Sequence, residues 1–200
     1  MPRNPNCITC QAISTKTGRR CSRRTCQLFP YCWQHLRLID GLAVKKSQIP
    51  GVGLGLYSFN KTFHKGDRIV EYTGDVKPFN PHDPKLNPYG VQINKKEIID
   101  ADNPHRHSVA RYSNDCRPIN KQKHQCAGNN AKLVYYDPKD VKNTEFEPYA
   151  GKVFIEAIKT IHPGEEIFVS YGKAYWEDMK KFGKHPANLH LKIPNSFWNE

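Results

Sequence analysis

Four residues near the start of the chain have the types and the spacing of metal ligands. Residues 7–35 read CITCQAISTKTGRRCSRRTCQLFPYCWQH. Thiolate and imidazole groups suit tetrahedral zinc, and four such ligands can fold a segment that is too small for a core of its own. Cys32 and His35 are three residues apart, so one helical turn places them on the same side, and Cys10 and Cys21 bracket a glycine-containing turn. We therefore predict a zinc site made of Cys10, Cys21, Cys32 and His35.

Two further cysteines compete for this site. Cys7 forms a CxxC pair with Cys10 and is the main rival ligand, and Cys26 is the other candidate. The stretch CQAISTKTGRRC followed by YCWQH resembles small Cys-Cys-Cys-His knuckles, which are common in proteins of large DNA viruses. Five basic residues between Cys10 and Cys26 either contact a phosphate backbone or form the solvated rim of the module. They are Lys16, Arg19, Arg20, Arg23 and Arg24.

A second group of reactive side chains lies in ARYSNDC, residues 110–116. This stretch sets an arginine, an aromatic residue, an asparagine and an aspartate in succession with little apolar cover. An asparagine amide offers both a donor and an acceptor to a ligand. Taken alone, the stretch fits a surface loop as well as a ligand pocket.

Glycines at 51, 53 and 55 form a third candidate, because they let the backbone approach a ligand closely or turn with a positive φ. Their spacing does not fit GxGxxG, and the residues that follow read as a strand, which argues against a dinucleotide site.

The elements that position these residues are predicted to be mainly short strands. Glycine, proline and asparagine separate the strand-like runs. These runs are RIVEYTG, YGVQIN, EIIDA, AKLVYYD, KVFIEAI and EIFVSYG. Helical patterning is confined to residues near 31–38, 105–110 and 173–183. The predicted fold class is therefore mainly β with short helices, plus the small amino-terminal zinc-binding module.

The composition of the whole chain limits the class of protein. It has 200 residues and a formal net charge of +12, which suits one domain with an accessory module and favours an acidic or polyanionic partner. The seven cysteines are an odd number, and no signal peptide is evident, which argues against a secreted disulfide scaffold. No apolar run approaches the roughly 18 residues of a membrane span. We expect a soluble, intracellular protein with no membrane partner.

After residue 43 the order of motifs resembles that of a SET domain, the fold of most protein lysine methyltransferases. KSQIPGVGLGLYS resembles the first motif of the family, KGDRIVEYTGD the second, and ARYSND the cofactor-binding segment. AIKTIHPGEEIFVSYG matches the last motif nearly throughout. The resemblance covers about residues 43–176, and it implies a β-clip architecture with a knot-like crossing, an exception to the usual absence of threaded loops.

The sequence departs from the family pattern in three places. Asp75 replaces a usual glutamate and Asp115 a usual histidine, and residues 116–129 form an insertion. The insertion carries Cys116 and Cys126, for which we expect two free thiols in preference to a metal site.

The resemblance also implies roles for individual residues. The near-invariant tyrosine of the last motif falls at Tyr171, which would be catalytic and orient the amine, and Tyr72 and Tyr112 would line the lysine channel. S-adenosylmethionine is the implied cofactor, and Arg111 would support the crossing by bonding backbone carbonyls. The implied cofactor-binding residues are Gly53, Leu54, Gly55, Arg111, Asn114, Asp115 and Trp176. For Tyr112 and Trp176, packing in the core is an open alternative.

The implied protein has a zinc-knuckle-like module (1–40), a SET domain (43–176) and a carboxyl-terminal extension (177–200). Its activity would be protein-lysine N-methylation, with a histone as the leading substrate. It would act in the nucleus or on chromatin, and if a virus encodes the protein, this would be the nucleus or chromatin of the host cell. A non-histone substrate and a catalytically weak module that binds chromatin or nucleic acid are the alternatives. The basic surplus suits DNA or nucleosome contact, and acidic residues near the motifs suit a basic substrate. These are Glu71, Asp75, Asp100, Asp102, Glu165 and Glu166.

Overall fold

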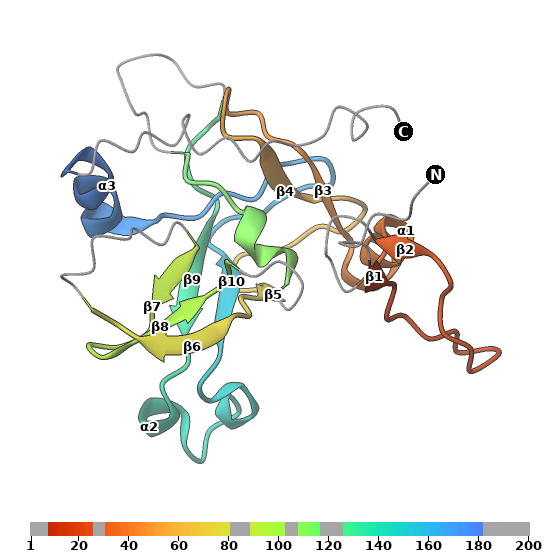
Figure 1. Cartoon of the computed structure of the whole chain (residues 1–200), viewed down its shortest axis with the longest axis horizontal. Coiled ribbons are helices and arrows are strands. Elements are labelled where there is room, and N and C mark those ends of the chain that lie inside the picture. Colours follow the sequence, from red (N-terminus) through yellow and green to blue (C-terminus); the bar gives the residue numbers. More distant parts are fainter. Residues whose placement is uncertain (1–7, 26–30, 81–88, 103–107, 117–125, 182–200) are drawn as a thin grey trace.

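Most of the regular secondary structure consists of short antiparallel strands in four small sheets (Figure 1). The computed structural model describes residues 8–25, 31–80, 89–102, 108–116 and 126–181. The two-stranded sheets are β1 (Ile8–Thr9) with β2 (Arg24–Thr25) and β3 (Leu42–Lys46) with β4 (Leu54–Ser58). One three-stranded sheet has the order β5 (Arg68–Glu71), β10 (Val153–Ala157), β9 (Ala131–Tyr135). The other has the order β6 (Asp75–Pro78), β8 (Glu97–Asp100), β7 (Gly90–Gln92).

The strand β10 lies at the centre of the core. It pairs with β5 on one side and β9 on the other, so that Ile155 stands opposite Val70 and Leu133. Its near-continuous apolar sequence matches this position, because a strand buried on both faces has no solvent-facing side. The fully buried apolar side chains that surround it come from every part of the described domain. Among them are Leu42, Leu56, Phe63, Ile161 and Ile167.

The run EIFVSYG is predicted as a strand, and this prediction is wrong. Isolated bridges join the run to Tyr57, Asn114 and Ala131, in three separate parts of the chain. Because each bridge uses a different partner segment, no continuous ladder forms. The bridges to Asn114 and Ala131 are parallel, so both flanks of the 116–129 insertion lie beside the last motif, in agreement with the crossing that the resemblance implies.

Helices appear where they are predicted, and two short ones are added. The predicted ones are α1 (Trp33–His35) continued by η1 (Leu36–Asp40), η2 (Val109–Tyr112) and α3 (Gly172–Lys181). The connection between β9 and β10 also holds α2 (Pro138–Val141) and η3 (Glu147–Tyr149). The Asp137 side chain caps α2 by accepting from the backbone N–H of Lys139. Both added helices are too short to show a helical period in the sequence.

The lobe built from β1, β2 and α1 lies at the right of Figure 1, and α3 lies at the far left. Within the described ranges, none of the helices combines the length and the apolar character that a membrane crossing requires.

Candidate functional site

The four predicted metal ligands come together in the amino-terminal lobe. The ligand atoms of Cys10, Cys21, Cys32 and His35 all lie within 4.8 Å of one another. The Nδ1 atom of His35 is 3.4 Å from the Sγ atom of Cys10 and 3.3 Å from that of Cys32. Zinc–sulfur bonds of about 2.3 Å in a tetrahedral site separate ligand atoms by roughly 3.5–3.8 Å, so these residues can hold zinc with little adjustment. Cys7 and Cys26 lie outside the described residues.

Backbone hydrogen bonds set this arrangement. The N–H of Cys10 donates to the carbonyl of Arg23 at 2.8 Å, and the N–H of Cys21 donates to that of Ala12 at 2.8 Å. Cys32 immediately precedes α1, so the first helical turn carries His35 to the same side. Burial alone raises the pKa of Cys32, but hydrogen bonds outweigh it and hold this pKa below its ordinary value; they come from the backbone N–H of His35, the Cys10 side chain, the backbone N–H of Gln34 and the Cys21 side chain. The thiolate, which binds metals, is thereby favoured.

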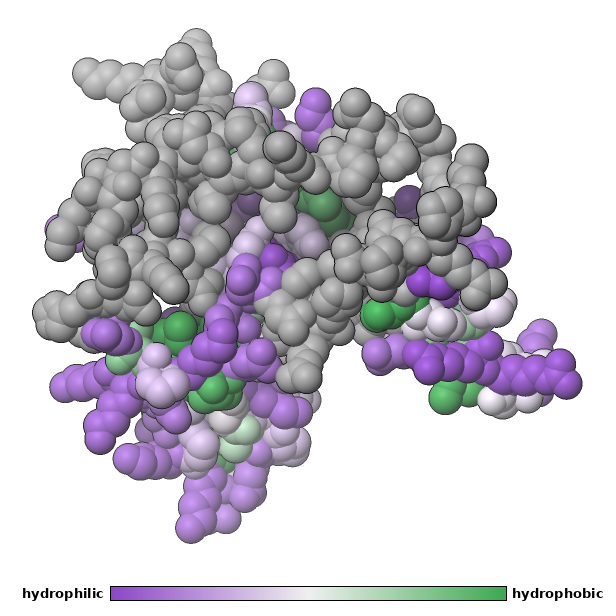
Figure 2. Space-filling view, viewed as in Figure 1, coloured by the Kyte–Doolittle hydropathy of each residue, from purple (hydrophilic) through white to green (hydrophobic). Residues whose placement is uncertain are grey.

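The same lobe carries an exposed basic surface. All five basic residues between Cys10 and Cys26 are exposed, and Figure 2 shows the lobe at the right as largely hydrophilic. Arg20 is held in place, because its side chain donates to the carbonyls of Cys10 at 2.9 Å and Thr9 at 3.0 Å.

The glycine-containing loop lies against a buried carboxylate. Gly53 has a φ of +85°, which favours glycine. A Cβ atom on Gly55 would be 2.1 Å from Oε1 of Glu166, so no larger residue fits there. The Glu166 carboxylate is 1% exposed and accepts from Ser47 Oγ at 2.6 Å, the Gln48 N–H at 2.7 Å and the Tyr57 hydroxyl at 2.9 Å. It therefore fastens the loop to the last motif.

Two of the acidic residues that the sequence assigns to substrate attraction do not serve it. Glu166 is buried and fully bonded inside the protein. Asp100 is 5% exposed, and its carboxylate pairs with Lys77 and accepts from the N–H of Asp102. The sequence could not predict the burial of these two carboxylates, because only the tertiary packing shows which carboxylates reach the surface.

Asn114 lies beside the same loop. Its amide nitrogen donates to the carbonyl of Leu54 at 2.9 Å and to Oε1 of Glu166 at 3.2 Å. These two bonds use both N–H groups of the side chain. The Oδ1 oxygen accepts no hydrogen bond from any other residue in the described part of the chain, so a bound ligand with an N–H donor can use it.

Tyr171 is held against residues of the ARYSNDC stretch. Its hydroxyl donates to the carbonyl of Ser113 at 2.8 Å. Its ring lies 4.8 Å from that of Tyr175, with the two planes at 71°. Burial, followed by the nearby Tyr175, Tyr72 and Asp115, raises the pKa of Tyr171 well above its ordinary value. The phenol is therefore neutral at any physiological pH.

Tyr72 and Tyr112 are linked to each other through Arg111 and a residue that the sequence does not predict, Tyr89. The hydroxyl of Tyr72, which is 7% exposed, donates to the carbonyl of Tyr89 at 3.0 Å. The Arg111 guanidinium stacks 3.9 Å from the Tyr89 ring and 5.6 Å from the Tyr112 ring. A lone tyrosine ahead of a short strand carries no signal in one sequence, so Tyr89 could not have been singled out.

Arg111 reaches the backbone of an earlier segment. Its side chain is 8% exposed and donates to the carbonyl of Asp102 at 3.1 Å. Asp115 is also buried, and its carboxylate accepts from the backbone N–H of Tyr171 and the indole N–H of Trp176. The Trp176 ring stacks on Tyr171 with centroids 6.2 Å apart and planes at 17°. The structure thus places Trp176 beside Tyr171.

The raised tyrosine pKa values predict a loss of stability in alkali. Burial raises the pKa of Tyr112 and of Tyr175 to about 12 each. In the unfolded chain, tyrosine ionises at about pH 10. Above this pH the unfolded state therefore releases phenol protons that Tyr112 and Tyr175 keep in the folded state. We expect the free energy of unfolding to be unaffected by these groups below about pH 10 and to fall as the pH rises above it. Denaturant titrations below and above this pH would measure the free energy of unfolding. The phenolate absorbance of the folded protein would show at which pH its tyrosines ionise. A single titration of all tyrosines near pH ~10 in the folded protein would contradict it.

The cysteines of the insertion are not free thiols, contrary to the expectation. Cys116 and Cys126 form a disulfide. The two thiols meet because the backbone N–H of Cys116 donates to Oδ1 of Asn129, which turns the end of the insertion back on its start. Spacing alone could not decide between these states.

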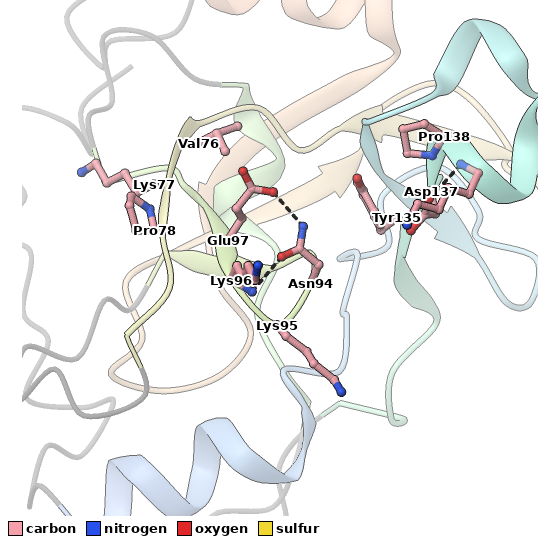
Figure 3. Close-up of a pocket in the computed structure, with 11 residues that line it drawn as sticks. Val76, Lys77, Pro78, Asn94, Lys95, Lys96, Glu97, Tyr135, Asp137 and Pro138 are labelled. Carbon is pink, nitrogen blue, oxygen red and sulfur yellow. Dashed lines mark hydrogen bonds between the residues drawn. The ribbon is translucent and has the colours of Figure 1, made fainter.

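A surface pocket of about 750 Å³ lies apart from these residues. Figure 3 shows its lining residues, which come from β6, from the turn that leads into β8, and from the segment that joins β9 to α2. Four lysines line it, Lys77, Lys95, Lys96 and Lys139, but none of the predicted catalytic or cofactor-binding residues does. We therefore place the candidate functional site at the tyrosines and the glycine loop, and not at this pocket.

A known protein family matches most of the described domain. The SET-domain family model matches residues 53–172. The chain is similar to the methyltransferase domain of human PR domain-containing protein 2, with a TM-score of 0.46 and 19% identity, over 70% of this chain and 84% of that one. It is also similar to a chain of ctPRC2 in complex with H3K27me3 and H3K27M, with a TM-score of 0.48 and 20% identity, over 67% of this chain and 15% of that one. No curated protein matches the sequence. The family model covers more than half of the chain, from the glycine loop to Tyr171, and the chain therefore belongs to the SET-domain family.

Proposed function

We propose that this chain is a protein-lysine N-methyltransferase that uses S-adenosylmethionine. The observation that carries the proposal is the place of Tyr171 in the last SET motif, with its hydroxyl bound to the carbonyl of Ser113, the residue before Asn114, and its ring against Tyr175. A site lined by aromatic rings suits an amine that must lose its charge before it reacts.

For methyl transfer, the protein must favour the neutral form of the substrate lysine and align its amine with the methyl group. A free lysine has a pKa of about 10.4, and burial among aromatic rings lowers it by disfavouring the ammonium form. The hydroxyl of Tyr171 donates to Ser113, so its oxygen lone pairs can accept an N–H of the incoming amine. This contact would direct the nitrogen lone pair for an in-line displacement. Tyr72 and Tyr112 would form the walls of the channel.

The residues near Asn114 fit the proposed cofactor. When bound, S-adenosylmethionine supplies a methyl group on a sulfonium. The Oδ1 oxygen of Asn114 would accept from the ammonium of its amino acid part, and the backbone of Gly53, Leu54 and Gly55 would lie along it. Trp176 would stack on the adenine. The contact of Asp115 would be through its backbone, because its carboxylate is used inside the protein.

A basic protein, with a histone as the leading candidate, is the proposed substrate. Asp102 is exposed beside the tyrosines, and a lysine-rich segment would complement it. The amino-terminal lobe is proposed as a structural zinc module (1–40) ahead of the SET domain (43–176). Its exposed arginines and the lysine-lined pocket would contact DNA or the nucleosome, which would place the protein on chromatin in the nucleus.

Methyl transfer from labelled S-adenosylmethionine tests the proposal. The whole chain is incubated with core histones and, separately, with a host-cell lysate. Label on histone is the expected result, and label only on lysate proteins would move the substrate to a non-histone protein. No transfer to either, combined with DNA binding that weakens steeply with salt, would overturn the enzyme and favour a chromatin-binding module.

A further inference from the structure

The Asp115 carboxylate receives three hydrogen bonds inside the protein. Its Oδ2 oxygen accepts from the backbone N–H of Tyr171 at 2.8 Å and from the indole Nε1–H of Trp176 at 2.9 Å. Its Oδ1 oxygen accepts from the Nδ2 group of Asn129 at 2.9 Å. The residue is 5% exposed. A buried charge satisfied in this way orders the groups around it, because each of them would otherwise lose a charge-assisted bond.

These bonds hold Tyr171 at both ends. Its backbone N–H is bound to Asp115, and its hydroxyl is bound to the carbonyl of Ser113, two residues earlier. The tyrosine therefore spans a three-residue segment and cannot turn its hydroxyl away without breaking one of the two bonds. The segment itself is anchored on its other side, where Asn129 also accepts from the N–H of Cys116 at 2.8 Å.

The same carboxylate fixes α3. Trp176 shares the Oδ2 oxygen with Tyr171 and stacks on its ring. Tyr175, also on α3, contacts both rings, at 4.8 Å from Tyr171 and 5.4 Å from Trp176. One side chain therefore sets the position of the tyrosine and of the two aromatic residues that enclose it.

We propose that Asp115 is the positioning residue of the methyl-transfer site, and that its carboxylate locks Tyr171 and Trp176 into one arrangement. This inference rests on the proposed function. A carboxylate is suited to the place because both oxygens must accept, whereas an amide presents one acceptor and one donor, and a neutral imidazole presents a single acceptor. With Asp115→Asn, an N–H group faces either Asn129 or the donors of Tyr171 and Trp176.

An exchange of the two side chains tests the idea. In Asp115→Asn combined with Asn129→Asp, the new amide oxygen accepts from Tyr171 and Trp176, and its NH₂ group donates to the new carboxylate at position 129. That carboxylate can still accept from the N–H of Cys116. The exchange restores the hydrogen bonds but moves the carboxylate from position 115 to position 129. It therefore separates an effect of the hydrogen bonds on the position of Tyr171 from an effect of the charge at position 115.

We expect Asp115→Asn to lower kcat by about 10- to 100-fold with a change in KM of less than about threefold, since misplacement affects the aligned state most. The double variant should recover most of kcat. Asp140→Asn, an exposed aspartate on α2, is the matched control and should leave kcat unchanged. A double variant as slow as Asp115→Asn would overturn the proposal.

A second readout is independent of turnover. The chain has three tryptophans, and the difference between wild type and Trp176→Phe identifies the near-ultraviolet circular dichroism of the Trp176–Tyr171 stack. We expect Asp115→Asn to remove this signal and the double variant to restore it, and an unchanged signal in Asp115→Asn refutes the inference. If the wild type transfers no methyl group, the proposed function fails, but this signal still reports on the carboxylate.

Discussion

Tyr171→Phe is expected to reduce methyl transfer by about 10²- to 10⁴-fold, the usual size of the effect when a positioned polar catalytic group is lost. The substitution keeps the ring and its contacts with Tyr175 and Trp176, and removes only the hydroxyl that faces Ser113. The amine then loses the oxygen that would direct it. Single-turnover rates with saturating S-adenosylmethionine measure the loss, and equilibrium binding of the cofactor should stay within about threefold of wild type, since the hydroxyl is not among its proposed contacts.

Tyr149→Phe provides the matched control for this loss. It also removes a phenol hydroxyl, but Tyr149 lies in η3, where its ring contacts Tyr136 and Phe154. Its rate should equal that of wild type. If Tyr171→Phe retains more than about a tenth of the wild-type rate, the hydroxyl does not orient the amine, and the catalytic role of Tyr171 is lost.

Removal of zinc is expected to unfold the amino-terminal lobe and leave the SET domain folded. A structural zinc site in a small module contributes about 10–16 kcal/mol of apparent binding free energy at neutral pH, more than a lobe with so small a core can supply. The described apolar cluster of the lobe holds only Cys10, Ala12 and Cys32 as buried members. We expect one zinc ion per chain by elemental analysis, and its loss in Cys32→Ser together with proteolytic cleavage within the lobe.

Variants of the two rival ligands test which residues bind the zinc. Cys7→Ser and Cys26→Ser should retain zinc, whereas Cys21→Ser should lose it. Zinc lost from Cys7→Ser but kept in Cys21→Ser would replace Cys21 by Cys7 in the ligand set. A wild-type chain that binds no zinc, with a lobe that resists proteolysis, would show that the three thiols and His35 pack without a metal.

Local signals in the sequence predicted most of the elements. The strands β5, β7, β8, β9 and β10 all fall inside runs of apolar and β-branched residues. EIFVSYG has the same pattern but takes its partners from three distant segments, so its bridges depend on how the chain crosses itself. Propensity does not record such long-range pairing.

The sequence by itself determined the family, the metal-ligand set that comes together, and the position of Tyr171, because motif order and ligand spacing depend on residue type and chain distance. Only the tertiary structure decided what the acidic side chains do. The sequence predicts that Glu166 attracts a basic substrate and that Asp115 belongs to the cofactor site, yet both carboxylates are buried among donors from segments far apart in the chain. The physical reason is that a count of net charge treats every acidic residue alike, wherever it lies. Whether it attracts a substrate or fastens a loop depends on which N–H and O–H groups the fold brings to it.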